Sequence, residues 1–251
     1  MNTMTMISKK FPKSEIACLE HGVAKVQVGP ELICPKCAIA LVNSNNANRQ
    51  DEVNKAVCKK HIEGAMIPER HAKSTLSNYL TKTQRQAHTL QTCVNYTQQI
   101  IKNLRGNLIM VGSTGTGKTH LACGVAKTLL KNGLKARYIT SEEIANRIMK
   151  AWDRDTKDQS EDSVIYDLAQ YELLIVDEYG LHDRDKRTEL VHKVLTERYD
   201  LKKPTMLISN FTLDHLQKDL GDRLWSRFQH DGLTLVECNW GDQRMGQGGG
   251  V

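Results

Sequence analysis

A glycine-rich stretch, GSTGTGKT at residues 112–119, directly follows the apolar run LIMV at residues 108–111. It matches the P-loop pattern, in which a glycine, four variable residues and a second glycine precede Lys and then Ser or Thr. In such a loop the backbone N–H groups surround a phosphate, and the N-terminus of the following helix favours the same negative charge. The sequence therefore predicts a buried strand, a phosphate-binding loop and a helix that begins near Thr119.

The side chains of this loop have separate expected roles. Lys118 would reach the outer phosphates of a nucleotide, and the Thr119 hydroxyl would bind Mg²⁺. Gly115 and Gly117 let the backbone approach the ligand because no Cβ stands in the way. We expect the nucleotide to be held by Gly112, Ser113, Thr114, Gly115, Thr116, Gly117, Lys118, Thr119 and His120.

A second motif, LLIVDE at residues 173–178, is an apolar strand that ends in two acids. Asp177 would complete the Mg²⁺ shell, as the second acidic element of P-loop proteins does. Glu178 is the natural candidate to orient or deprotonate an attacking water. A buried strand before an ordinary acidic turn would look the same, but the P-loop upstream favours a joint nucleotide site.

Polar residues at the ends of other elements fit the same chemistry less specifically. Asn210 follows the run PTMLIS at 204–209, where it could touch the outer phosphate or the water, or only form a turn. Arg223 and Arg227 lie four residues apart on one helical face. Guanidinium groups can spread transition-state charge in phosphoryl transfer, but such pairs also occur on solvated helices. Arg244 alone would be read as a surface residue.

From Asn107 onward, short apolar runs alternate with helical patterns. Strands are expected at residues 107–111, 136–140, 172–177, 204–209 and 233–237. Helices are expected at residues 119–131, 141–152, 162–169, 187–200 and 221–229. This alternation is typical of the α/β class, with a parallel sheet covered by helices.

As an ordered set, the motifs resemble the DnaC-type replicative helicase loaders, a branch of the AAA+ ATPases. The resemblance extends from about Ile67 to Met245. It is carried by IPERH (67–71), SNY (77–79), GSTGTGKTHLA (112–122), LLIVDE (173–178), LISN (207–210), GDRLWSRF (221–228) and NWGDQR (239–244). It implies a Mg²⁺-dependent ATPase in which Asn210 is the sensor-1 residue, Arg227 a finger acting on a neighbouring subunit's ATP, and Arg244 the sensor-2 arginine.

The resemblance also implies partners. Loaders of this type self-associate through the ATPase domain and deliver a hexameric replicative helicase onto single-stranded DNA. The segment N-terminal to the ATPase core would contact the helicase. Two other functions stay open: related transposition helpers share much of the pattern and act on double-stranded DNA, and an adaptor could hold nucleotide without significant turnover.

Two pairs of metal-ligating residues occur near the N-terminus, each with two residues between its members and twelve residues between the pairs. The candidate ligands are Cys18, His21, Cys34 and Cys37. This spacing is typical of a tetrahedral structural Zn²⁺ site in a zinc-ribbon-like unit, which some phage-type loaders carry. A rival set replaces the first pair with Cys58 and His61, but we prefer the first set because its pairs flank one hairpin.

Composition sets further limits on the 251 residues. The chain is 39% apolar and 25% charged, as is ordinary for a globular protein. No apolar stretch approaches the length of a bilayer, and residues 1–13 lack a secretory signal, so we expect a cytoplasmic protein. Seven cysteines without an export signal disfavour a disulfide framework. The cysteines expected to be packed apolar residues are Cys93, Cys123 and Cys238.

Four regions are expected along the chain: a zinc-binding unit (1–42), a helical linker region for partner contact (43–104), the AAA+ ATPase domain (105–245) and a disordered tail (246–251). In the second region the run NSNNAN at 43–48 predicts a turn-rich linker, and helices are expected near 50–62 and 83–103.

Basic residues contribute to a net charge of +6. They include Lys9, Lys10, Lys13, Lys55, Lys59, Lys60, Arg70, Lys73, Lys82, Arg85, Lys131, Lys135 and Arg137. Because aromatic residues make up only 5% of the chain, no base-stacking platform is visible. We expect DNA to be gripped by its backbone without sequence preference, although ordinary solvated surfaces would explain any one of these residues equally well.

Overall fold

The computed structural model describes residues 11–153, 159–181 and 185–243. The chain forms two compact units, Met1–Val57 and Cys58–Val251. The predicted tail at 246–251 lies outside the described residues. None of the helices in the described ranges combines the length and the apolar character needed to cross a bilayer.

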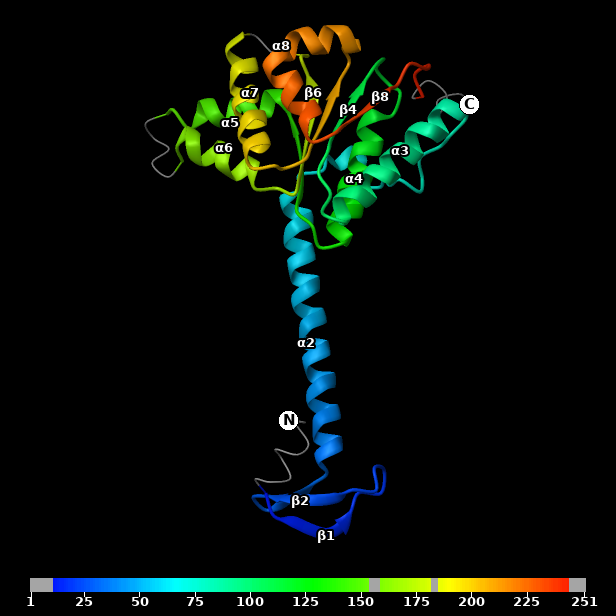
Figure 1. The fold of residues 1–251 in the computed structure, drawn as a ribbon, viewed down its shortest axis with the longest axis vertical. Coiled ribbons are helices and arrows are strands. Elements are labelled where there is room, and N and C mark those ends of the chain that lie inside the picture. Colours follow the sequence, from blue (N-terminus) through cyan, green and yellow to red (C-terminus); the bar gives the residue numbers. More distant parts are fainter. Residues whose placement is uncertain (1–10, 154–158, 182–184, 244–251) are drawn as a thin grey trace. The chain divides into compact units, whose positions relative to one another are not determined.

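The first unit contains a three-stranded antiparallel sheet in the order β1-β2-β3 (Figure 1). Its strands are β1 (Lys13–Ala17), β2 (Ala24–Val28) and β3 (Glu31–Ile33). The hairpin expected between the two ligand pairs is present: β2 and β3 pair, and Gly29, with φ 59°, lies in the connection between them. Val26 on the central strand is buried at 2% exposure and pairs with Ile33.

A long helix, α2 (Pro35–Gly64), corrects the prediction of a turn-rich linker at 43–48. All six of those residues are helical. No Gly or Pro occurs between residues 36 and 63, and Asn and Ser cost a helix only about 0.7 kcal/mol or less each relative to Ala. The helix therefore continues to Gly64, with the side chains of residues 40–57 exposed.

The second unit is built on five parallel strands in the order β5-β6-β7-β4-β8. They are β4 (Asn107–Val111), β5 (Ala136–Thr140), β6 (Leu173–Tyr179), β7 (Thr205–Ser209) and β8 (Leu233–Glu237). Each strand lies within two residues of its predicted range. The α/β class expected from the alternating pattern is confirmed.

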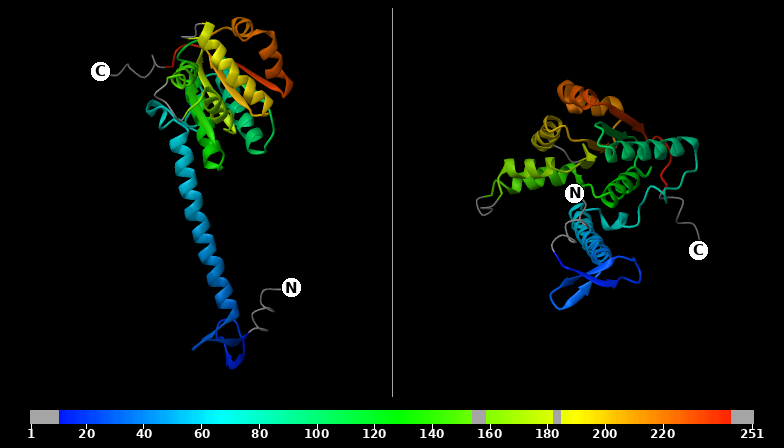
Figure 2. Two further views of the ribbon diagram at one scale, coloured as in Figure 1. Left: turned by 90° about the vertical axis from the view of Figure 1, so that its left-hand side faces the viewer. Right: turned by 60° about the horizontal axis from the view of Figure 1, so that its bottom comes forward.

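Helices cover both faces of this sheet (Figure 1 and Figure 2). They are α3 (Gln84–Ile101), α4 (Lys118–Lys131), α5 (Ser141–Lys150), α6 (Glu161–Ala169), α7 (Asp185–Asp200) and α8 (Leu213–His230), with a short 3₁₀ helix η1 (Glu69–His71). The helices α3 and α4 pack on one core, and α5 to α8 pack on the other. Strand side chains alternate between the two cores: Met110 belongs to the first and Ile109 to the second.

The helix predicted at 221–229 is only the second half of α8. The observed helix begins at Leu213, after the Thr212 hydroxyl accepts a hydrogen bond from the His215 N–H. Gly221 interrupts it with φ 70° and ψ 160°. Because this backbone conformation is accessible to glycine, the chain changes direction there and begins a new helical segment.

Residues 58–104 belong to the same compact unit as the parallel sheet. The helix α3 predicted at 83–103 is present, and it buries Cys93, Tyr96 and Ile100 against the same core as α4. Ala65, the residue after α2, also contacts the sheet, since the Tyr138 N–H of β5 donates to its carbonyl at 2.9 Å. The functional division expected at residue 105 stays a prediction.

Arg137, one of the basic residues that could have faced DNA, is buried at 5% exposure. Its Nη1 donates to the Gly64 carbonyl at 2.7 Å, at the end of α2. A cation near the C-terminus of a helix is favoured by the helix dipole. This arginine stabilises the second unit and is not available to a backbone phosphate.

Three cysteines are confirmed as core residues, since Cys93, Cys123 and Cys238 each have 0% exposure. Burial raises the pKa of the Cys93 and Cys123 thiols to about 12 and that of Cys238 to about 11. The three thiols are protonated at neutral pH and pack as small apolar groups.

Arg198, near the end of α7, is fully buried and forms no ion pair with any described residue. Its guanidinium donates to the carbonyl oxygens of Leu168, Ala169, Tyr171 and Pro204 and to the hydroxyl of Thr205. Burial lowers the pKa of Arg198 to about 9, so it remains charged at neutral pH. The side chain joins the end of α6 and the loop before β6 to the start of β7.

We expect Arg198→Met to lower the free energy of unfolding by about 3 kcal/mol, because several buried carbonyls lose their donor. Urea unfolding followed by circular dichroism measures the change. The matched control is Arg85→Met on the exposed face of α3, which should stay within about 0.5 kcal/mol of the original protein. A similar small effect from both substitutions would show that Arg198 does not hold these loops.

Candidate functional site

The phosphate-binding loop connects β4 to α4, as the P-loop pattern predicts. Gly117 precedes α4 with φ 91°, and a Cβ on it would lie 2.8 Å from the Tyr79 ring. A Cβ on Gly115 would overlap the Asp242 carboxylate. Glycine is required at both positions, and the loop backbone can approach a ligand closely.

Lys118 and Thr119 place their polar atoms at the loop. The Lys118 ammonium donates to the carbonyls of Gly112 at 2.7 Å and Ser113 at 2.8 Å. Thr119 Oγ1 donates to Asp177 Oδ2 at 2.8 Å, across 58 residues of sequence. A hydroxyl and a carboxylate side by side are the protein ligands that P-loop enzymes use for Mg²⁺, so this pair fits the ion.

The Asp177 carboxylate is buried at 3% exposure and held by further donors. The Tyr138 hydroxyl, from β5, donates to the same Oδ2 at 2.8 Å. Burial raises the pKa of Tyr138 and the nearby Asp177 charge raises it further, so the hydroxyl keeps its proton. The Glu178 N–H donates to the other oxygen, Oδ1, at 2.7 Å. Donors from three elements thus fix one orientation of the carboxylate.

Glu178 adopts a left-handed backbone conformation with φ 56°. The register of β6 against β7 shifts between Val176 and Tyr179, and the Ser141 hydroxyl donates to the Glu178 carbonyl at 3.1 Å. A non-glycine residue in this region is uncommon, and such strain occurs often at functional sites. The irregularity leaves the Glu178 side chain exposed at the nucleotide cavity while Asp177 stays buried.

Asn210 directly follows β7, and β7 lies between β4 and β6 in the sheet. All three strands are parallel, so their carboxyl ends meet at one edge. The Ser209 hydroxyl donates to the Tyr179 carbonyl at 2.8 Å and joins the ends of β7 and β6. Asn210 therefore follows the strand that lies between the strand of the phosphate-binding loop and the strand of the acidic pair, and it lines the same cavity.

A cavity of about 480 Å³ opens at this edge. The predicted residues that line it are Gly115, Thr116, Gly117, Lys118, Thr119, His120, Asp177, Glu178 and Asn210. Gly112, Ser113 and Thr114 belong to the loop without lining the cavity. Further lining residues, which the sequence did not predict as ligand contacts, are Arg70, His71, Ser74, Asn78, Tyr79, Leu80, Lys82 and Gln243.

The segment at residues 70–82 forms this unpredicted wall, and it is fixed to the loop and to α4. His120 Nε2 lies 2.9 Å from Asn78 Oδ1, and the Tyr79 hydroxyl donates to the Thr116 carbonyl at 3.1 Å. Burial lowers the pKa of His71, and the proximity of His120 adds to the effect. A nucleotide whose phosphates occupy the loop would therefore have its remaining part beside this segment.

The C-terminal segment also reaches the loop. Trp240 Nε1 donates to the Thr116 carbonyl, and the Gln243 N–H donates to the Gly115 carbonyl, both at 3.0 Å. Residues 240–243 of the NWGDQR motif thus reach the phosphate-binding loop. Arg244, its last residue, lies outside the described residues.

Arg227 lies far from the nucleotide cavity of the same chain. It is near the end of α8, where the neighbouring Phe228 carbonyl accepts a hydrogen bond from Asn107 Nδ2 at 3.1 Å. Asn107 is the first residue of β4, whereas the phosphate-binding loop follows the last. Five residues of strand span about 16 Å, so Arg227 occupies the opposite edge of the sheet. Arg223 is exposed on the same helix.

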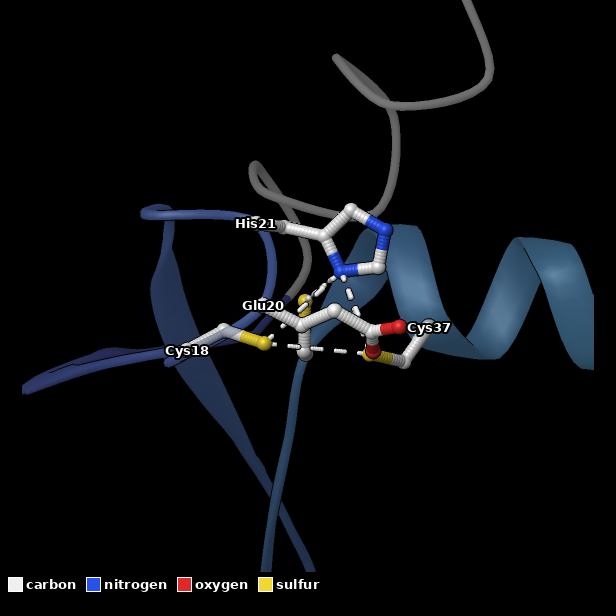
Figure 3. A network of polar contacts seen from close by, with 5 residues as sticks. Cys18, Glu20, His21 and Cys37 are labelled. Atoms are coloured by element: carbon white, nitrogen blue, oxygen red, sulfur yellow. Dashed lines mark hydrogen bonds and ion pairs between the residues drawn. The ribbon is translucent and has the colours of Figure 1, made fainter.

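A second candidate site lies in the first unit (Figure 3). The possible ligand atoms are the Sγ atoms of Cys18, Cys34 and Cys37 and Nδ1 of His21, all within 4.8 Å of one another. Cys18 Sγ and Cys37 Sγ are 3.7 Å apart, and Cys37 Sγ is 3.3 Å from His21 Nδ1. Ligands about 2.3 Å from one Zn²⁺ would be about 3.8 Å apart on a tetrahedron. This donor set fits a structural zinc.

Tight turns bring the four ligands together. The Cys18 N–H donates to the Val23 carbonyl and the Gly22 N–H donates to the Cys18 carbonyl, both at 2.8 Å. The second pair spans the junction of β3 and α2. Cys58, from the rival set, instead has its thiol 3.8 Å from the Leu130 carbonyl in the second unit. The geometry favours the set that the spacing predicted.

Comparison with known proteins identifies the family. A family model described as IstB-like ATP binding protein matches residues 42–234. The chain belongs to this family. The replicative helicase loader DnaC of Escherichia coli K12 is 26% identical over 225 residues, which cover 89% of this chain and 90% of the relative. The uncharacterized protein YdaV of the same strain is 25% identical over 197 residues, 78% of this chain and 76% of the relative.

Solved structures share the fold of this IstB-like chain. A crystal structure of the DnaC helicase loader matches with a TM-score of 0.59 and 23% identity, over 68% of this chain and 99% of that one. A crystal structure of DnaI matches with a TM-score of 0.56 and 18% identity, over 71% of this chain and 95% of that one. The AAA+ fold expected from the motifs is confirmed.

Two parts of the nucleotide site carry no signal that sequence reasoning could use. Tyr138 lies in the middle of the strand ARYIT (136–140), where a tyrosine looks like an ordinary core residue. The wall at 70–82 has no nucleotide motif of its own, although IPERH and SNY contribute to the family resemblance. Both parts are found only when the tertiary structure brings them to Asp177 and Thr116.

We expect the purified protein to carry one Zn²⁺ per chain, and Cys34→Ser to lose it, because a tetrahedral site cannot close with three strong ligands. Elemental analysis after desalting measures the metal. Cys58→Ser is the matched control and should retain zinc. Loss of zinc from Cys58→Ser together with its retention in Cys18→Ser would instead support the rival ligand set.

Proposed function

We propose that this IstB-like protein is an ATP-dependent loader that delivers a replicative DNA helicase onto single-stranded DNA. The main support is the joint site formed by the phosphate-binding loop, Asp177 and Glu178, in a chain that is similar over 89% of its length to the helicase loader DnaC. ATP binding would favour self-association and tight binding of the helicase and of DNA. Hydrolysis would then release the loader.

The residues of the cavity would have separate roles in ATP hydrolysis. Mg²⁺, bound by Thr119 and Asp177, would neutralise charge on the phosphates. Lys118 would hold the outer phosphates, and the exposed Glu178 carboxylate would orient or deprotonate the attacking water. Asn210, at the end of the intervening strand, is placed to contact the outer phosphate or that water. Arg244 would serve as the sensor-2 arginine, as the family resemblance implies.

The position of Arg227 supports hydrolysis completed between subunits. The guanidinium lies at the edge of the sheet opposite its own cavity, beyond the reach of one side chain. It could stabilise the charge of a phosphoryl transfer only in an adjoining protomer. Turnover should therefore depend on assembly.

We expect the ATPase rate per subunit to rise with protein concentration or with single-stranded DNA, and Arg227→Ala to lose about a thousandfold or more of the stimulated rate while still binding nucleotide. Steady-state ATPase assays and a fluorescent ATP analogue measure the two properties. Unchanged turnover in the variant would remove Arg227 from the finger role.

Glu178→Gln tests whether the protein turns ATP over at all. A hydrolase that loses its water-orienting carboxylate should remain in the ATP-bound assembly, which size-exclusion chromatography with ATP would detect as a persistent oligomer. An adaptor that only holds nucleotide would show the same oligomer distribution before and after the substitution. That result would replace the loader proposal with the adaptor.

DNA preference separates the loader from a transposition helper. We expect tighter binding to single strands than to duplex of the same length, and an affinity that falls as salt rises, because contacts to the backbone release counterions. Fluorescence anisotropy at several salt concentrations measures both. Preference for duplex would favour the transposition helper, and an affinity independent of salt would contradict a backbone grip.

A further inference from the structure

The Arg227 side chain has an unusual environment for a half-buried arginine. It makes no hydrogen bond and no ion pair with any residue in the described ranges. The contact it does make is with an aromatic ring: its Cζ atom lies over Tyr199, 4.9 Å from the ring centre. A ring holds a guanidinium by its flat face and leaves the in-plane N–H donors available.

Charges nearby do not explain why an arginine is held there. Arg227 lines a small hollow together with Arg105, Lys202 and Lys203, and Asp231 is the acidic residue in the same lining. A surface with this excess of positive charge attracts an anion from outside the subunit. The phosphates of a nucleotide bound to an adjoining protomer are an anion of that kind.

Tyr199 itself is held from two sides. Its hydroxyl lies 3.0 Å from His230 Nδ1, at the end of α8. The preceding residue, Arg198, is the fully buried side chain that ties the end of α7 to the loops around it. The backbone of α8 beside Arg227 is fixed by the hydrogen bond from Asn107 to the Phe228 carbonyl. Both partners of the ring contact thus come from anchored helix ends.

We propose that Tyr199 is a positioning residue that holds the Arg227 guanidinium ready for the nucleotide of the adjoining subunit. The inference rests on the proposed finger role of Arg227. Tyr199 would touch neither the nucleotide nor the water. The ring would restrict the conformations of the free Arg227 side chain, so less conformational entropy would be lost when two subunits meet. The rate of hydrolysis would rise, and nucleotide affinity would not change.

Two substitutions distinguish the contribution of the Tyr199 ring from that of its hydroxyl. We expect Tyr199→Leu to lose about tenfold to a hundredfold of the stimulated ATPase rate, because the guanidinium loses its platform. Tyr199→Phe keeps the ring and should stay within about threefold of the original rate. Both variants should bind a fluorescent ATP analogue as the original protein does. Equal rates for Tyr199→Leu and the original protein would overturn the inference.

A mixing experiment distinguishes a positioning role from simple damage to the fold. Glu178→Gln subunits cannot hydrolyse ATP but carry an intact Arg227, whereas Tyr199→Leu subunits have an intact cavity and a misplaced finger. Mixed at equal concentration, they should hydrolyse ATP faster than the sum of the two separate preparations. If the mixture hydrolyses ATP no faster than the sum of the two preparations, the substitution has damaged the nucleotide cavity of the Tyr199→Leu subunit. The inference would then be wrong.

The same mixture made with Arg227→Ala in place of Tyr199→Leu tests the finger role alone. Suppose that Arg227→Ala regains ATPase activity when mixed with Glu178→Gln subunits, while Tyr199→Leu by itself keeps the full stimulated rate. The proposed function then stands, and the inference about Tyr199 is wrong. If Arg227→Ala alone keeps full stimulated turnover, the finger role fails and the inference falls with it.

Discussion

The Asp177 carboxylate accepts hydrogen bonds from Thr119 at the start of α4, from Tyr138 on β5 and from the backbone that leads to Glu178. A buried carboxylate is costly unless donors surround it, so these contacts must form together. Once they form, the phosphate-binding loop, the strand with the acidic pair and the neighbouring edge strand have fixed relative positions. The shape of the nucleotide cavity depends on this one group.

The parallel sheet imposes the second constraint. Its carboxyl ends carry the phosphate-binding loop, the acidic pair and Asn210, and its opposite edge carries the end of α8 with Arg227. Because the sheet is rigid, the carboxyl ends of its strands and the opposite ends stay apart. Under the proposed mechanism the protein therefore divides its catalytic groups between two surfaces, and an assembly of subunits is needed to join them. Under that mechanism the rate of hydrolysis would depend on how many subunits have assembled.

Local patterns predicted the elements of the second unit well, because its strands are continuous apolar runs bounded by strong turn signals. They failed where composition misled: residues 43–48 are polar, yet with no Gly or Pro nearby the helix α2 continues through them. In residues 58–104 they predicted the helix at 83–103, but not that its Tyr96 and Ile100 pack on the same core as α4. Arg137 looks like a surface charge in the sequence, but the end of α2 buries it.

The sequence by itself determined the identity of the nucleotide machinery and the pairs of possible zinc ligands, because each depends on residue types at fixed short spacing: GSTGTGKT, the acidic pair after an apolar strand, and Cys or His two residues from Cys. Only the tertiary structure decided which of these groups meet. It brought Thr119 to Asp177, added Tyr138 and the wall at 70–82, gathered Cys18, His21, Cys34 and Cys37, and placed Arg227 over the Tyr199 ring. Those contacts join residues far apart in the chain, and they follow from the packing of strands and helices, which spacing along the sequence does not encode.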